Sequence, residues 1–216
     1  QLGSYDLYYL DQSWVATFAQ DTIDPIQYYK DKPDLAMPGM DWEDFSKPLV
    51  DGLALYEGKW VGIPFDIPIM TTMYRKDIFA SKGITMPERP TWQQVAEMAA
   101  KVDGAAPGMK GICLRGLPGW GELGAALTTV VNTFGGTWFT KDWQAQVNSP
   151  EFKEATNFYV NLVKAHGEPG ASQAGFTECL NAMSQSKVAM WYDATSAAGS
   201  LEDPKVSKVA GKVGYV

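Results

Sequence analysis

EGKWVGIPFDIPIMTTMYRK, residues 57–76, contains a turn, an extended crossing and a strand in close succession. Gly58 and Lys59 separate two short apolar runs, and glycine readily adopts the backbone angles of a tight turn, so a hairpin with its turn at Gly58 and Lys59 is predicted. Pro64 and Pro68 each lack a backbone donor and favour an extended conformation in the preceding residue. The segment GIPFDIP is therefore predicted to be a stiff, extended crossing, and residues 69–74 are predicted to form a strand.

Upstream of this crossing, the sequence predicts one strand and two helices. Residues 4–10, SYDLYYL, have the tyrosine and leucine content that is typical of a strand. Asp11 is a suitable N-cap for a helix over about residues 12–20, which have apolar side chains at helical spacing. Asp41 is a suitable N-cap for a second helix that runs to about residue 50.

Downstream of the crossing, helices and strands alternate. Thr91 and Gln94 have the spacing of a capping box at the start of a helix. Ser149, followed by a proline, begins a second helix, which Gly167 ends. A strand is predicted over residues 188–192. Alternation of this kind indicates an α/β protein, with one lobe on each side of the crossing.

The predicted division of the chain has three parts. Residues 1–66 belong to an N-terminal lobe, 67–207 to a C-terminal lobe, and 208–216 to the start of a return crossing to the first lobe. The N-terminal lobe is expected to be incomplete, because strands are predicted at both ends of the chain. Residues 1–66 are therefore not expected to form a fully paired sheet by themselves.

The composition argues against some classes of partner. The chain has 216 residues, a formal net charge of −7 and a pI near 4.7. This acidic balance argues against nucleic acid or an anionic membrane surface as a partner. No apolar run approaches the length of a membrane span. The eight Trp and ten Tyr residues supply flat amphipathic side chains that suit a ligand cleft as well as a core.

The cysteines and the histidine do not suggest a metal or catalytic site. Cys113 and Cys179 lie far apart in the sequence, and their spacing does not match a metal-binding motif. Two buried free thiols are the expected state, with a disulfide as the alternative. His166, the only histidine, lies at the predicted end of a helix, where it complements the helix dipole. No metal, no other cofactor and no catalytic residue is therefore assigned.

Polar residues occur where strands of the predicted sheet end, which is the usual place for a ligand in an α/β protein. Asp11 and Gln12 follow the first predicted strand, and a loop rich in glycine runs from Arg115 to Glu122. Arg115 is a candidate ligand donor, with an ion pair to Glu122 as the structural alternative. Glu122 could otherwise serve only as a favourable charge at a helix N-terminus.

The strand at residues 188–192 leads to a second group of candidates. Asp193 is the first charged residue after it and is expected to point into a cleft and contact the ligand. The alternative role for Asp193 is to cap the turn that begins at Ala194. Trp191 faces either the core or the cleft, and Thr195 lies among small residues that let donors approach a bound molecule.

Six motifs follow one another along the chain: GKWVGIPFD, YRKDIF, PTWQQVAEMAAKV, GWGE, GGTWF and VAMWYDATSAAG. In this order they resemble the extracellular solute-binding proteins of ABC sugar transporters, and they are most similar to the branch that binds sugar alcohols such as mannitol, sorbitol and arabitol. The resemblance covers nearly the whole chain. The chain is shorter than full members, without the first strand–helix units of the N-terminal lobe, the segment that returns to it and the C-terminal helices.

This resemblance implies a fold, a location and partners. The fold is a two-lobed, periplasmic-binding-protein-like fold of type II that closes on its ligand about a hinge. The location is the periplasm or a lipid-anchored position at the cell surface. The partners are a small polyol or sugar and the permease subunits of an ABC transporter, and the protein is expected to be a monomer.

A neutral polyol has hydroxyl groups and aliphatic C–H faces, and the candidate residues suit both. Carboxylates and arginine form charge-assisted hydrogen bonds with hydroxyls, and tryptophan covers C–H faces. The predicted ligand-binding residues are Asp11, Gln12, Asp66 in the crossing, Arg115, Trp120, Glu122, Trp191, Asp193 and Thr195.

The predicted function is therefore to bind a sugar alcohol or monosaccharide and deliver it to a permease, without chemistry. An oligosaccharide is the alternative ligand within this class. A glycoside hydrolase is a rival, because paired carboxylates and tryptophans also form such sites, although nothing in the sequence fixes an acid and a nucleophile at a catalytic separation. An interaction module with an aromatic surface is the other rival.

Overall fold

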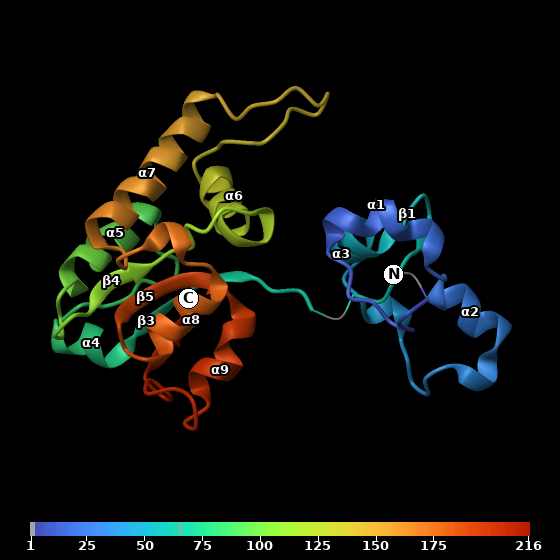
Figure 1. The fold of residues 1–216 in the computed structure, drawn as a ribbon, viewed down its shortest axis with the longest axis horizontal. Coiled ribbons are helices and arrows are strands. Elements are labelled where there is room, and N and C mark those ends of the chain that lie inside the picture. The colour runs from blue at the N-terminus through green and yellow to red at the C-terminus, as the bar shows by residue number, and fades with distance from the viewer. Residues whose placement is uncertain (1–2, 65) are drawn as a thin grey trace. The chain divides into compact units, whose positions relative to one another are not determined.

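Two units with different architectures make up the chain (Figure 1). The computed structural model describes residues 3–64 and 66–216. The first unit comprises Gln1–Ile67 and the second Pro68–Val216. The sequence placed the boundary one residue earlier, between Asp66 and Ile67.

The first unit consists of short helices and one small hairpin. Its helices and strands are α1 (Val15–Phe18), α2 (Pro25–Asp31), α3 (Lys47–Leu49), β1 (Leu55–Tyr56) and β2 (Lys59–Trp60). Further 3₁₀ or π turns lie at Gln12–Trp14, Ala19–Asp21, Pro33–Leu35, Trp42–Asp44 and Val50–Ala54.

Local signals in the first unit predicted both caps and the hairpin correctly, although the turn lies at Glu57 and Gly58, one residue earlier than Gly58 and Lys59 as predicted. Strands β1 and β2 pair antiparallel, and Glu57 and Gly58 between them have φ values of 50° and 79°. Positive φ at both central residues is what a type I′ hairpin turn requires. Asp11 and Asp41 each accept a hydrogen bond of 2.9 Å from the backbone two residues later, as N-caps do.

Two predicted elements of the first unit are wrong. Residues 4–10 form no strand, because a strand needs a partner and the described residues of this unit pair only in the β1–β2 hairpin. The helix predicted to begin after Asp41 is broken into a 3₁₀ turn, α3 and a π turn. Pro48 lies in this stretch and has no N–H, so a continuous helix would lose a hydrogen bond there.

A four-stranded mixed sheet organises the second unit. In spatial order, its strands are β4 (Lys110–Cys113), β5 (Val188–Ala194), β3 (Met70–Arg75) and β6 (Val213–Tyr215). Strands β4 and β5 are parallel, whereas β3 is antiparallel to both β5 and β6. The helices are α4 (Lys76–Ser81), α5 (Trp92–Val102), α6 (Ala125–Thr133), α7 (Pro150–His166), α8 (Phe176–Ser184) and α9 (Ala198–Glu202). The predicted α/β class is therefore confirmed.

Two apolar layers cover the two faces of this sheet. One layer packs Ile112 and Met190 against α5, α6 and α7. The other packs Met73 and Trp191 against α8 and α9. Met190 and Trp191 are neighbours in β5 and enter different layers, because successive side chains of a strand point to opposite faces.

The predicted starts of two helices in the second unit are confirmed. Thr91 and Gln94 form the reciprocal capping box of α5, with hydrogen bonds of 3.2 and 2.9 Å. The Ser149 hydroxyl accepts a bond of 3.2 Å from the backbone in the first turn of α7. His166 is the last residue of α7, and its Nδ1 lies 3.1 Å from a carboxylate oxygen of Asp103.

Strand β6 joins the last residues of the chain to the sheet of the second unit. Residues 208–216 were expected to begin a return crossing, but here they belong to the second unit, and Gly214 pairs with Tyr74 of β3. A Cβ at position 214 would lie 2.4 Å from the Tyr74 ring. Only glycine allows the strand to approach that ring so closely.

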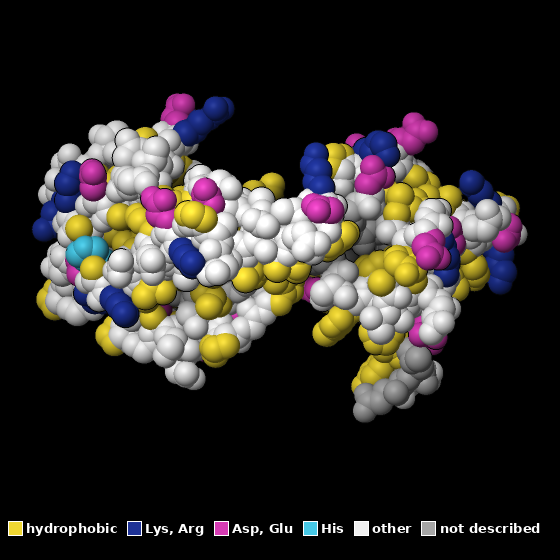
Figure 2. All heavy atoms as spheres, turned by 90° about the horizontal axis from the view of Figure 1, so that it is seen from above, with side chains coloured by type: hydrophobic (Ala, Val, Ile, Leu, Met, Phe, Trp, Pro, Cys, Tyr) yellow, Lys and Arg dark blue, Asp and Glu magenta, His cyan; other side chains and the backbone are white. Residues whose placement is uncertain are grey.

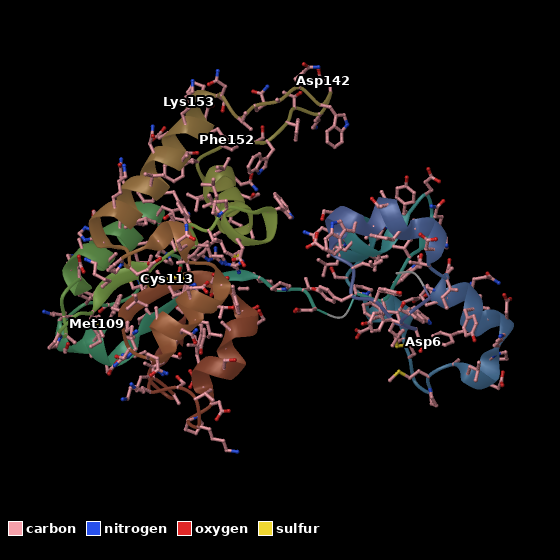
Figure 3. All side chains as sticks on the ribbon, viewed as in Figure 1. Asp6, Met109, Cys113, Asp142, Phe152 and Lys153 are labelled. Atoms are coloured by element: carbon pink, nitrogen blue, oxygen red, sulfur yellow. A yellow bond between two sulfur atoms is a disulfide. The ribbon has the colours of Figure 1, made fainter. Side chains whose placement is uncertain are left out.

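A disulfide joins β4 to α8 in the interior of the second unit. Cys113, labelled in Figure 3, is bonded to Cys179, and their Cα atoms are 5.6 Å apart. The expectation of two free thiols is wrong. The two residues are separated by 66 positions in the sequence, so only the packing of the helix on the sheet shows that they meet.

Glu168 lies two residues after the end of α7 and has a buried carboxylate. Neither oxygen has a hydrogen-bond partner among the described residues. Burial raises the pKa of Glu168 to about 7. The backbone N–H groups of Glu168 and Leu114 oppose this shift only in part, because neither forms a hydrogen bond of normal geometry with the carboxylate.

Glu168→Gln should stabilise the oxidised protein at pH 8 and change little at pH 4. The unfolded carboxyl ionises near pH 4.5, whereas the folded one holds its proton to about pH 7. The free energy of unfolding of the unchanged protein is therefore retained in full below pH 4.5. It falls as the pH rises to 7, because the folded protein resists ionisation of Glu168. The substitution should raise the free energy of unfolding at pH 8 by about 2–3 kcal/mol. Urea denaturation at both pH values measures this, with Glu154→Gln as the control, because Glu154 is an exposed residue of α7. An equal effect at both pH values would contradict it.

Helix length and the charges on one face of the molecule are two further features of the part of the chain that the structure describes. Within the described ranges, no helix is both long and apolar enough to cross a membrane. Figure 2 shows acidic side chains interspersed with basic ones on the visible face, without a broad basic area. This distribution agrees with the acidic net charge of the sequence.

Candidate functional site

A buried ion pair lies at the centre of the predicted site residues of the second unit. Arg115 is 6% exposed and Asp193 is fully buried. The guanidinium forms a bidentate pair with the carboxylate, with Nε donating to Oδ2 at 2.7 Å and Nη2 donating to Oδ1. Trp191 Nε1 donates to Oδ2 at 2.9 Å, and the Ala194 backbone donates to Oδ1 at 2.6 Å. Each carboxylate oxygen therefore has two donors.

Asp193 lies buried within the sheet of the second unit instead of following the end of its strand, and contact with a ligand stays a prediction. Strand β5 continues through Ala194, and Asp193 pairs with Thr71 inside the sheet instead of following the end of the strand. Its side chain lies on the same face as Trp191, where α8 and α9 cover it. The alternative role as a cap is not seen either, because the turn at Thr195–Ala197 has no side-chain cap.

Trp191 belongs to the core. It has no exposed surface, and its ring centroid lies 5.5 Å from that of Phe176 in α8. The interpretation as a residue that lines a cleft is therefore wrong for this structure. Trp191 instead supports the site indirectly, because its indole N–H holds the Asp193 carboxylate.

The guanidinium of Arg115 also holds the loop that follows it. Its Nη1 donates to the Gly121 carbonyl at 2.6 Å and lies 3.5 Å from Glu122 Oε2. The predicted pair with Glu122 thus exists but is long, and Asp193 is the main partner. Burial alone would lower the pKa of Arg115, but the hydrogen bonds and charge of Asp193 outweigh burial and raise it. Arg115 therefore stays charged and fixes the loop to the sheet.

Glu122 lies in the first turn of the helical segment Trp120–Gly124 that leads into α6, as its structural alternative proposed, and it also lies at the N-terminus of α8. Its Oε2 accepts a hydrogen bond of 2.9 Å from the backbone N–H of Phe176, the first residue of α8. A carboxylate at this position is favourable for the helix dipole. A Cβ at Gly175 would lie 2.6 Å from this oxygen, so glycine permits the contact. The Glu122 side chain remains 34% exposed.

Trp120 is the aromatic residue of the predicted site that remains open to solvent in the second unit. It is 50% exposed and is the first residue of a π-helical turn, Trp120–Gly124, which ends the loop after Arg115. Its ring centroid is 6.4 Å from that of Trp138, whose indole N–H donates to Thr128 at 3.1 Å. The Trp120 ring therefore contacts the Trp138 ring, which a hydrogen bond holds in place, while half of the Trp120 surface remains exposed.

Thr195 connects the end of β5 to the segment before β3. Its backbone N–H donates to the Ile69 carbonyl at 2.9 Å, and its hydroxyl accepts from the Ile69 N–H at 3.2 Å. The side chain is exposed. Its hydroxyl proton is still able to donate to a ligand.

Three predicted site residues belong to the first unit. Asp11 is occupied as an N-cap, with its Oδ1 accepting from both the backbone and the hydroxyl of Ser13. Gln12 and Asp66 are exposed. A groove of about 270 Å³ in this unit includes neither Asp11 nor Gln12; it is lined by Tyr8, Tyr9, Leu10, Trp14, Phe18, Asp21 and Thr22.

Two residues that contact Arg115 were missed in the sequence. The Tyr159 hydroxyl, buried in α7, donates to the Arg115 carbonyl at 2.7 Å. Burial raises the pKa of Tyr159, so this donor stays protonated. The guanidinium carbon of Arg115 lies 5.1 Å from the centre of the Phe176 ring. Both residues read as core positions of amphipathic helices, and neither is near Arg115 in the sequence.

Sequence comparison places the whole chain in one family. The family described as bacterial extracellular solute-binding protein matches residues 1–216. A mannitol-binding protein of Pseudomonas aeruginosa is 42% identical over 173 residues, which are 80% of this chain and 39% of that protein.

Solved structures show the same fold. A solute-binding protein of an ABC transporter from Agrobacterium vitis S4, with bound D-mannitol, is 40% identical with a TM-score of 0.81, and the match covers 95% of this chain and 47% of that one. A second solute-binding protein of an ABC transporter, from Agrobacterium radiobacter K84 in complex with ribitol, has a TM-score of 0.85 at 24% identity. The match covers 99% of this chain and 52% of that one, and this likeness concerns the fold alone. The chain thus spans about half the length of the relatives it matches.

Proposed function

Because the chain belongs to the bacterial extracellular solute-binding proteins, we propose that the protein binds a sugar alcohol as the substrate-binding component of an ABC transporter. The observation that carries this proposal is the similarity, above 40% identity over 173 residues, to a mannitol-binding protein. The likeness to a structure with bound D-mannitol supports the same ligand class. Export from the cytoplasm and delivery to permease subunits are parts of this proposal.

The geometry of the second unit supports a neutral polyol as the ligand. The half-exposed ring of Trp120 offers an apolar face for the C–H groups of a polyol. Glu122 and Thr195 keep exposed polar groups that suit hydroxyls. Arg115 and Asp193 neutralise each other, so this region does not present a strong positive charge that would favour an anionic sugar. We assign to Arg115 and Asp193 the role of holding the segment that contains Trp120, instead of a direct contact between Asp193 and the ligand.

Binding without chemistry is the corresponding expectation for activity. In the described second unit, the Asp193 carboxylate is fully engaged by four donors, and Glu122 is held by the start of α8. Neither is placed as the free acid or nucleophile of a glycosidase. We therefore expect the ligand to be released unchanged.

A ligand panel tests this proposal on the whole protein. Thermal unfolding should shift to higher temperature with D-mannitol, D-sorbitol, D-arabitol or ribitol, because a ligand that binds only the folded state stabilises it. NMR of the recovered ligand should show no product. A shift with maltose alone would favour the oligosaccharide alternative. No shift with any polyol, or formation of a product, would contradict the proposal.

Trp120→Ala should weaken binding of the best polyol about 10-fold to 100-fold, because it removes the apolar face that the ligand would bury. Isothermal titration calorimetry on the whole protein measures the affinity. Trp143→Ala is a matched control, since Trp143 is 79% exposed on the segment between α6 and α7. An unchanged affinity in Trp120→Ala, or an equal loss in both variants, would show that Trp120 does not line the site.

A further inference from the structure

Three potential ligand atoms meet in the interior of the second unit, away from the Trp120 loop. The two sulfur atoms of Cys113 and Cys179 and a carboxylate oxygen of Glu168 all lie within 4.8 Å of one another. They come from three different elements: β4, α8 and the segment after α7. That segment is fixed against the sheet, because Gly167 forms a β-bridge with Ile112.

Among the residues that the structure describes, the Glu168 carboxylate has no hydrogen-bond partner in the oxidised protein. Both oxygens are buried without a hydrogen bond among the described residues. A buried carboxylate without a partner is costly, and such groups in native proteins call for an explanation. The disulfide that faces it has no proton to donate. Reduction changes this, because it leaves two sulfur atoms that can act as donors or as metal ligands beside the carboxylate.

We propose that Cys113, Cys179 and Glu168 form a redox-gated site, which holds a divalent d¹⁰ cation such as Zn²⁺ or Cd²⁺ when the disulfide is reduced. Two thiolates and one carboxylate are a donor set that Zn²⁺ accepts, with a water molecule in the fourth position. Thiolates select soft cations, whereas Ca²⁺ and Mg²⁺ prefer oxygen ligands alone. The cation would supply the partner that the Glu168 carboxylate lacks.

The required movement is small. The Cα atoms of the two cysteines are 5.6 Å apart. Zn–S bonds of about 2.3 Å at a tetrahedral angle hold two sulfurs roughly 3.8 Å apart. The sulfurs reach this separation through side-chain rotation, with β4 and α8 remaining in contact.

Reduction and oxidation of the site each transfer two electrons. A dithiol reductant gives two electrons and two protons to the Cys113–Cys179 bond, which becomes two thiols while the reductant becomes a disulfide. The cation then displaces the two thiol protons. On oxidation, the two thiolates pass two electrons to an external disulfide, which leaves as two thiolates. The cation is released with its charge unchanged.

Cadmium titration of the whole protein tests the proposal. The disulfide is first reduced with a phosphine, and two thiols per chain are verified after denaturation. The reduced protein should bind one Cd²⁺ per chain, with a sulfur-to-cadmium charge-transfer band in the ultraviolet, and the oxidised protein should bind none. Glu168→Gln should weaken binding by at least about tenfold, because the loss of even an outer-shell partner costs that much. Glu178→Gln is the control, since its carboxylate binds the backbone of Gly175.

A reduced protein that loses its fold would still give a decisive result. In that case one equivalent of Cd²⁺ should restore the far-ultraviolet circular dichroism, because a metal that binds only the folded form drives folding. Failure to restore it would overturn the proposal. So would the absence of the charge-transfer band in folded, reduced protein, equal binding by the oxidised protein, or equal affinities of Glu168→Gln and the unchanged protein.

Discussion

Replacing both Cys113 and Cys179 with serine should lower the free energy of unfolding of the second unit by about 4 kcal/mol. The bond closes a loop that spans 66 positions and joins β4 to α8. Without it the unfolded chain gains conformational freedom, which accounts for the loss in the chain-entropy treatment of disulfides.

Urea denaturation of the oxidised protein and the double variant measures this effect. Oxidised and reduced samples of the unchanged protein provide an internal comparison, because reduction alone should give a similar loss. The double variant should be insensitive to reductant. A loss below about 1 kcal/mol would show that the bond adds little to the packing of α8 on the sheet.

Arg115→Met should destabilise the second unit by about 3–5 kcal/mol, because it leaves Asp193 as a buried charge without its partner. Asp193 is fully buried, and the guanidinium supplies two of its four donors. Replacement of both residues, as Arg115→Met with Asp193→Leu, should cost much less than the single change, since no charge is then left unpaired.

Chemical denaturation of the three variants measures these effects. Arg89→Met is the matched control, since Arg89 is exposed and its loss should change the free energy of unfolding by less than about 0.5 kcal/mol. If the single and double variants lose the same amount, the ion pair is not the cause. If Arg115→Met is as stable as the control, the carboxylate is held by Trp191 and the backbone alone.

Local signals in the sequence predicted local structure well. The turn at Glu57 and Gly58 and the caps at Asp11, Thr91 and Ser149 are all present. Each depends on residues within a few positions of one another, so the sequence contains the whole interaction. The wrong prediction of a continuous helix from Asp41 to residue 50 also has a local cause. Pro48 lies inside that stretch, and a proline is unfavourable in a helix interior.

Contacts between residues far apart in the sequence determine the remaining features of the fold and the site. No local pattern in the sequence predicted these contacts. Asp193 was expected at the open end of a strand because β5 was predicted to end at Tyr192, whereas the strand extends through Ala194. The disulfide and the Tyr159–Arg115 contact depend on how helices pack on the sheet. Four of the site candidates lie together: Arg115, Glu122, Trp191 and Asp193. Arg115 and Glu122 hold a loop, whereas Trp191 and Asp193 are buried.

The order of strands in the sheet has a consequence for how the chain is made. Strand β3 lies between β5 and β6, and both neighbours come late in the sequence: Thr71 pairs with Asp193, and Met73 with Tyr215. A ribosome must therefore release almost the entire second unit before its middle strand finds either partner. Sheets closed by such distant contacts fold slowly. A delay of this kind leaves β3 exposed to aggregation until β5 and β6 have been made.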